Sequence, residues 1–244
     1  MNKYVIIHVN FMKGELVMRQ FLLGNLSTML YAITVIHAAF IAILIKKYKD
    51  TKYFMFLLAA IITFGLFYDA LFISLGSFIK GGSVFKGLSQ LRFIFHGAFI
   101  PLLLPISAEA LHASDKTKKI VWAITAFVVA FGIAESCVTV LDGETVGNIF
   151  RYKAGEASPK WATTGSLILS IAPDLVLMIC GIIATIKKKN PYLFLSGFFM
   201  FAISAAGASA GDLMFFTSMF GEVLMILFMI LYGDKDTKAM AKVE

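Results

Sequence analysis

The chain alternates long apolar segments with short polar or glycine-rich connections. A helix needs about 20 apolar residues to cross the hydrocarbon core of a bilayer, and seven segments satisfy this requirement. They cover residues 22–45, 53–79, 88–112, 120–141, 161–186, 192–212 and 214–232. The pattern predicts an all-α integral membrane protein, a single bundle of seven transmembrane helices.

The connections between these segments define the rest of the predicted organisation. The sixth and seventh segments are separated only by "AGDLM" (210–214), whereas the longest connection runs over 142–160. His8 and Asn10 interrupt the first apolar run, so residues 1–21 are predicted to be an N-terminal interfacial or flexible segment. Residues 22–232 then form the membrane domain, and residues 233–244 form a tail.

Composition supports the assignment to the membrane. Hydrophobic residues make up 59% of the chain and charged residues only 15%, whereas soluble domains average about 25% charged residues. The net charge is +7, but the lysines stand in short runs beside apolar segments, as in "KKYKDTK" (46–52). This arrangement is typical of helix flanks in bilayers, and it does not indicate nucleic-acid binding.

The distribution of lysine and arginine predicts an orientation. These residues are more numerous after the first, third and fifth predicted helices and in the C-terminal tail than in the alternate connections. Because positively charged loops stay on the cytoplasmic side, the N-terminus is predicted to lie outside and the C-terminus in the cytoplasm. The cell (plasma) membrane is the expected location, with membrane lipids as neighbours.

Ionisable residues occur inside several of the predicted helices at similar depths. With a rise of 1.5 Å per residue, four lie roughly 9–15 Å from the outer ends of their helices: Asp69, His96, Glu135 and Glu222. His37 and Asp174 lie deeper, and Arg92 lies near the outer surface, one helical turn before His96. Since exposing such groups to lipid costs several kcal/mol, we expect them to face one outward-opening polar site.

Acidic groups outnumber basic ones in this layer. Several carboxylates cannot all stay charged in a medium of low dielectric constant, so a metal ion, a pool of protons or a cationic ligand is required. His37, His96 and Asp69 could bind a divalent metal such as zinc. Alternatively, the acids and histidines could relay protons, as in pumps and coupled transporters.

These residue types indicate a membrane-embedded hydrolase of a lipid-like substrate as the first hypothesis. The ligands or general acid/base groups would be Asp69, His96, Glu135, Asp174 and Glu222. Arg92 and Tyr68 would contact the substrate. A proton- or cation-coupled transporter of a small molecule, using the same groups, is the alternative.

The third predicted helix resembles that of microbial rhodopsins. Arg92 is followed nine residues later by Pro101 and then by "LLL", and Tyr68 occupies a plausible pocket position in the second helix. The resemblance implies seven helices around a ligand. That family holds retinal on a lysine of the seventh helix, and residues 214–232 contain no lysine, so a rhodopsin-like sensor here would lack covalent retinal.

Overall fold

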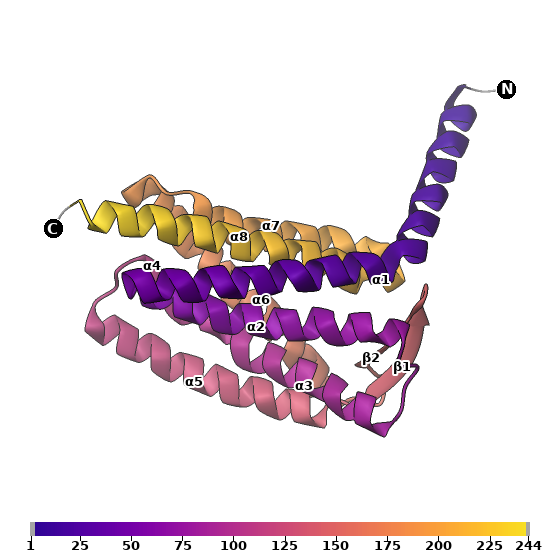
Figure 1. The fold of residues 1–244 in the computed structure, drawn as a ribbon, viewed down its shortest axis with the longest axis horizontal. Helices are drawn as coiled ribbons and strands as arrows, with labels where there is room; N and C mark the ends of the chain where they lie inside the picture. The colour runs from indigo at the N-terminus through magenta and orange to yellow at the C-terminus, as the bar shows by residue number, and fades with distance from the viewer. Residues whose placement is uncertain (1–2, 243–244) are drawn as a thin grey trace.

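The computed structural model describes the backbone of residues 3–242 and the side chains of residues 17–242. Most of the chain is helical (Figure 1). The helices are α1 (Lys3–Thr51), α2 (Phe54–Ser74), α3 (Ser83–Phe99), α4 (Leu103–Ala110), α5 (Asp115–Val138), α6 (Lys160–Lys188), α7 (Tyr192–Gly207) and α8 (Met214–Met240). Two strands form a hairpin, β1 (Leu141–Val146) and β2 (Ile149–Ala154), and 3-10 turns cover Leu75–Ser77, Ile100–Leu102 and Ala208–Leu213.

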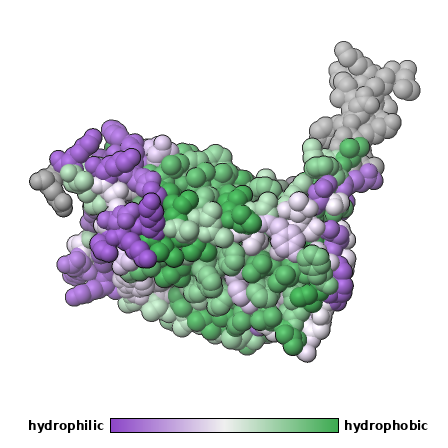
Figure 2. All heavy atoms as spheres, in the orientation of Figure 1, coloured by the Kyte–Doolittle hydropathy of each residue, from purple (hydrophilic) through white to green (hydrophobic). Residues whose placement is uncertain are grey.

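Among the described residues, six helical segments are long and apolar enough to cross a membrane. On the face drawn in Figure 2, apolar residues form a belt across the middle of the molecule, and polar residues gather at its two ends. The predicted multi-pass, helical membrane architecture is therefore confirmed. We call the two ends the hairpin end, where β1 and β2 lie, and the lysine-rich end, where the C-terminus lies (Figure 1).

The longest of the six segments, Tyr192–Met240, contains both α7 and α8. Gly211 interrupts it with φ +60° and ψ −121°, a backbone conformation that glycine adopts without strain. The two helices then lie side by side (Figure 1), and the Ser196 hydroxyl donates to the Met225 carbonyl oxygen at 2.9 Å. The segment thus folds back on itself at the predicted connection between the sixth and seventh helices.

The terminal helices extend beyond the predicted membrane domain. Helix α1 begins at Lys3, and its first turns project from the bundle (Figure 1). Helix α8 continues to Met240, and Asp236 near its end is only 4% exposed. Part of the segment predicted to be a tail is therefore a packed helix.

The predicted loop over residues 142–160 contains the β-hairpin, which the sequence analysis did not anticipate. The strands pair antiparallel from Leu141 opposite Ala154 to Val146 opposite Ile149. Gly147 turns the chain with φ +56°, and glycine is the residue preferred at the first position of a tight hairpin turn. The fold is therefore a helical bundle with a small sheet covering one end.

A close approach of α3 and α5 fixes the position of the third span. Gly97 and Gly132 face each other, so that a Cβ added to either would collide with the carbonyl group of the other. A Cβ at Gly97 would also lie 2.9 Å from the Ser136 hydroxyl oxygen. Small residues at a helix crossing allow backbones to approach closely in membranes.

We predict that Gly97→Ala lowers the free energy of unfolding in detergent by about 1–3 kcal/mol because two backbones must separate. Gly87→Ala on the same helix is the control, since a Cβ there meets nothing within 4 Å. It should be neutral or stabilising by up to about 1 kcal/mol through helix propensity. Equal effects of the two substitutions in thermal unfolding would contradict the packing role.

Candidate functional site

A partly buried ion pair joins α2, α3 and the hairpin. The Arg92 Nε lies 2.7 Å from the Asp69 Oδ1, and the side chains of Arg92 and Asp69 are 6% and 26% exposed. The same guanidinium donates through Nη1 to the Tyr152 carbonyl oxygen on β2 at 3.2 Å. Arg92 therefore binds an acid within the bundle and the backbone of the sheet that covers it.

Three other predicted site residues lie within electrostatic range of this pair. His37 on α1, His96 on α3 and Glu222 on α8 each interact with the charge of Asp69. His96 and Glu222 also lie within range of the Arg92 charge. We call these residues the central cluster: His37, Asp69, Arg92, His96 and Glu222. Four helices contribute to it, the consecutive helices α1, α2 and α3 and the C-terminal helix α8.

The central cluster contains buried polar atoms that lack partners. Within the described part of the chain, neither ring nitrogen of His37 makes a hydrogen bond, and the His37 residue is 0% exposed. The Glu222 Oε2 is likewise buried without a partner. Because such groups cost free energy when left unsatisfied, the cluster has spare capacity to hold a proton, a water molecule or a polar ligand.

The central cluster contains two carboxyl groups, Asp69 and Glu222, but only one side chain that is always positively charged, Arg92. Arg92 neutralises Asp69, with which it shares a hydrogen bond. Glu222 has no cation bound to it in the described structure. In a medium of low dielectric constant a second carboxylate needs a proton or another cation, so Glu222 is the residue at which charge can change.

The remaining two predicted acids have other neighbours. Glu135 on α5 is near the hydroxyls of Ser136 and Ser166. Asp174 on α6 is buried against Gly197 of α7 and has one oxygen without a partner among the described residues. The predicted layer of acids is thus divided between the central cluster and two separate helix contacts.

Tyr68 and His96 each have a defined partner. The Tyr68 hydroxyl donates to the Leu88 carbonyl oxygen at 3.2 Å, and the ring stacks on Phe72 with centroids 4.2 Å apart. This tyrosine packs against aromatic residues. The His96 Nε2 lies 3.5 Å from the Ser170 hydroxyl oxygen on α6, a contact that the sequence did not predict.

The predicted zinc site finds no support among the described side chains and stays a prediction. In the portion of the chain with described side chains, no three His, Cys, Asp or Glu residues come together as a metal-binding group. Of the predicted ligands, His37 and His96 are within electrostatic range of Asp69, but Asp69 is already bound to Arg92. The guanidinium would repel a divalent cation at that carboxylate.

The hairpin places a second arginine above the central cluster. The Arg151 Nε donates to the Glu144 Oε1 at 2.7 Å, and its guanidinium lies 3.8 Å from the Phe215 ring centroid. Arg151 is within electrostatic range of Asp69 and Arg92. The alternation of apolar and charged residues in "IFRYK" (149–153) after a Val-Gly-Asn turn could have indicated this strand.

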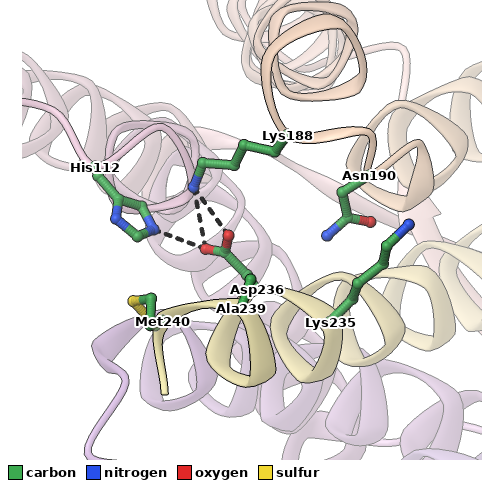
Figure 3. Close-up of a pocket in the computed structure, with 7 residues that line it drawn as sticks. All are labelled: His112, Lys188, Asn190, Lys235, Asp236, Ala239 and Met240. Carbon is green, nitrogen blue, oxygen red and sulfur yellow. Dashed lines mark hydrogen bonds and ion pairs between the residues drawn. The ribbon is translucent and has the colours of Figure 1, made fainter. Parts of the chain in front are cut away.

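A second polar cluster lies at the lysine-rich end. The Asp236 carboxylate accepts hydrogen bonds from Lys188 Nζ at 2.9 Å, from His112 Nε2 at 2.8 Å and from the Tyr53 hydroxyl at 3.0 Å. Figure 3 shows Lys188 and His112 converging on Asp236. The sequence does not predict this cluster, because Asp236 lies in the segment expected to be a tail.

No known protein family matches the chain, and no curated protein shows significant similarity to it. The functional interpretation therefore depends on the geometry of these two clusters.

We predict that Asp69→Ala lowers the free energy of unfolding by about 3 kcal/mol, because it leaves a buried guanidinium unpaired. The double variant Asp69→Ala/Arg92→Leu should recover much of this loss, since no buried charge remains. Chemical unfolding in detergent micelles measures both. Additive losses would show that the two side chains do not interact.

The hairpin ion pairs predict a dependence on pH. Burial alone would raise the pKa of Glu144, but hydrogen bonds and charges from Lys153 and Arg151 outweigh it and hold the pKa below its ordinary value of 4.5. The stabilisation is therefore present above pH 4.5 and is lost as the pH falls further. Glu144→Gln should lower the melting temperature at neutral pH and have little effect in acid.

Glu156→Gln is the matched control for this experiment, because Glu156 is an exposed acid in the same connection. Its effect on the melting temperature should be small at both pH values. A loss of stability in Glu144→Gln that persists unchanged in acid would contradict the role assigned to the ionised carboxylate.

Proposed function

We propose that this protein is a proton-coupled membrane carrier that works at the central cluster. The observation that carries the proposal is the buried carboxylate of Glu222. One of its oxygens has no partner among the described residues, and it lies within electrostatic range of an ion pair that is already neutral. Intramembrane acids of this kind are typical of proton relays in pumps and transporters.

The charge balance favours a cation as the transported solute. Glu222 can be neutralised either by a proton or by a positively charged ligand, and low dielectric surroundings disfavour the state with neither. The two forms of neutralisation exclude each other at one carboxylate. The carrier would therefore exchange protons for a small cation, with the unpartnered His37 nitrogens able to bind or pass the proton.

We infer seven membrane crossings, with α7 and α8 crossing separately. The reversal at Gly211 and the lateral packing of the two helices support this count. The lysine-rich end, which carries Lys47, Lys188 and Lys235, would then be cytoplasmic by the distribution of positive charge. The hairpin would cover the central cluster from the outside of the cell membrane.

One observation favours the hydrolase as a second candidate. The 3.5 Å contact between His96 Nε2 and the Ser170 hydroxyl oxygen would suit a base beside a nucleophile acting on a lipid-like ester. However, the Ser170 hydroxyl also donates to the Ser166 carbonyl oxygen at 2.9 Å, as helix serines commonly do. A rhodopsin-like ligand sensor would use the central cluster without net proton transport.

The test is proton movement in proteoliposomes that contain a pH-sensitive dye. A gradient of a small inorganic or organic cation should drive proton movement in the opposite direction through the unmodified protein. Glu222→Gln should abolish this coupling, because the amide can neither gain nor lose a proton. Glu135→Gln is the matched control, since Glu135 lies in a different helix contact.

Two outcomes would contradict the carrier. Proton movement that persists in Glu222→Gln would remove that residue from the pathway. Release of fatty acid from ester lipids that is lost in Ser170→Ala, without coupled proton movement in the unmodified protein, would favour the hydrolase. A protein that binds a ligand but moves no protons would be a sensor.

A further inference from the structure

A pocket of about 570 Å³ lies at the lysine-rich end, remote in the bundle from the hairpin. Its walls come from the ends of α6 and α8 and from the connections that follow α4 and α6 (Figure 3). They consist of His112, Lys188, Asn190, Lys235, Asp236, Ala239 and Met240. The candidate membrane-spanning segments end at Ala110, Lys188 and Met240, so the pocket lies at the level of lipid headgroups.

The pocket has an excess of positive charge and a lysine with free donors. Lys188 is occupied by Asp236 and by the Ala110 carbonyl oxygen at 2.7 Å. Lys235 donates to the Lys189 carbonyl oxygen at 2.5 Å, and an ammonium group has three hydrogens. Its remaining hydrogens can bind an anion that enters the pocket.

Asn190 adds a buried acceptor without a partner. The residue is 1% exposed, and its Nδ2 donates to the Tyr232 carbonyl oxygen at 3.1 Å. This bond sets the orientation of the amide, because an oxygen turned toward that carbonyl would be repelled. The Oδ1 is left without a hydrogen-bond donor from the described residues, so a ligand that fits the pocket should supply one.

Asp236 is not available for a metal or a cationic ligand. Its carboxylate already accepts from Lys188, His112 and Tyr53. Two groups of the pocket therefore have unused hydrogen-bonding capacity. The Lys235 ammonium can donate to an anion, and the Asn190 Oδ1 can accept from a donor. Ala239 and Met240 supply an apolar wall beside them.

We propose that this pocket binds a phosphate group that has an N–H donor close to it, the chemistry of a phosphoethanolamine headgroup. Lys235 binds the phosphate, and the ammonium of the headgroup donates to the Asn190 Oδ1. Basic pockets between transmembrane helices are suited to lipid headgroups. The site is separate from the central cluster and does not depend on the proposed carrier function.

Binding of two lipids with the same charge tests this proposal. Phosphatidylethanolamine and phosphatidylcholine both carry a phosphate and a cationic nitrogen, but only the ethanolamine group has N–H donors. Titrated into delipidated, detergent-solubilised protein and followed by thermal unfolding, phosphatidylethanolamine should bind about tenfold more tightly, the effect of one charge-assisted hydrogen bond. Equal binding of the two lipids would overturn the proposal.

Substitutions in the pocket test whether phosphatidylethanolamine binds there. Lys235→Gln should weaken phosphatidylethanolamine binding about tenfold, whereas Lys238→Gln, the same change on an exposed lysine of α8, should not. Asn190→Ala should remove the preference for ethanolamine over choline. If the two lysine variants weaken binding equally, the affinity comes from general surface charge and the proposal fails.

Two further measurements complete the experiment. The melting temperature of each variant without lipid shows whether it is folded, and Lys235→Gln changes a side chain on the surface of α8. Soluble O-phosphoethanolamine distinguishes the source of the ligand. Competition at concentrations similar to those of the lipid would support a free phosphate ester, and competition only in large excess would support a membrane lipid.

Discussion

Arg92 is held inside the bundle by Asp69 and by the carbonyl oxygen of Tyr152. In the low-dielectric interior of a membrane protein a guanidinium needs such partners, because removing one of them leaves a buried charge without compensation. This requirement fixes α2, α3 and β2 relative to one another. His37, His96 and Glu222 are within electrostatic range of the pair, so the proposed proton site is built on this one interaction.

The two ends of the bundle are held by different chemistry. At the hairpin end, Glu144 binds Arg151 and Lys153 within the sheet, and Asn148 at the turn donates to Ser27 of α1 at 2.8 Å. At the lysine-rich end, the Asp236 carboxylate accepts hydrogen bonds from Lys188, His112 and Tyr53, which lie in three other parts of the chain. Ion pairs thus tie the helices together beyond the apolar belt, where lipid no longer surrounds them.

Between these ends, the unsatisfied groups are few and specific. Most hydroxyls in the helices donate to a backbone carbonyl one turn earlier, as Thr34, Thr63 and Ser107 do. In the described structure, the buried side chains with an unpartnered atom are His37 and Glu222 of the central cluster and, elsewhere, Ser89, Asp174, Asn190 and Ser204. Because buried polar groups are normally paired, each of these atoms marks a place where a proton, a water molecule or a ligand can bind, and in the central cluster they belong to two ionisable residues.

The amino-acid sequence by itself determined the membrane architecture and the approximate limits of the apolar helices, because hydrocarbon thickness imposes a length and composition on each span. It also predicted Asp69, Arg92, His96 and Glu222 as candidate site residues, since ionisable residues within apolar segments are rare. Only the tertiary structure decided that Glu135 and Asp174 contact residues outside the central cluster. It also decided that Asp69 is bound to Arg92. Finally, it showed that Asp236 and the hairpin belong to the packed fold. Depth along a helix follows from residue number, but the direction in which a side chain points depends on helix rotation and on contacts between segments distant in the chain.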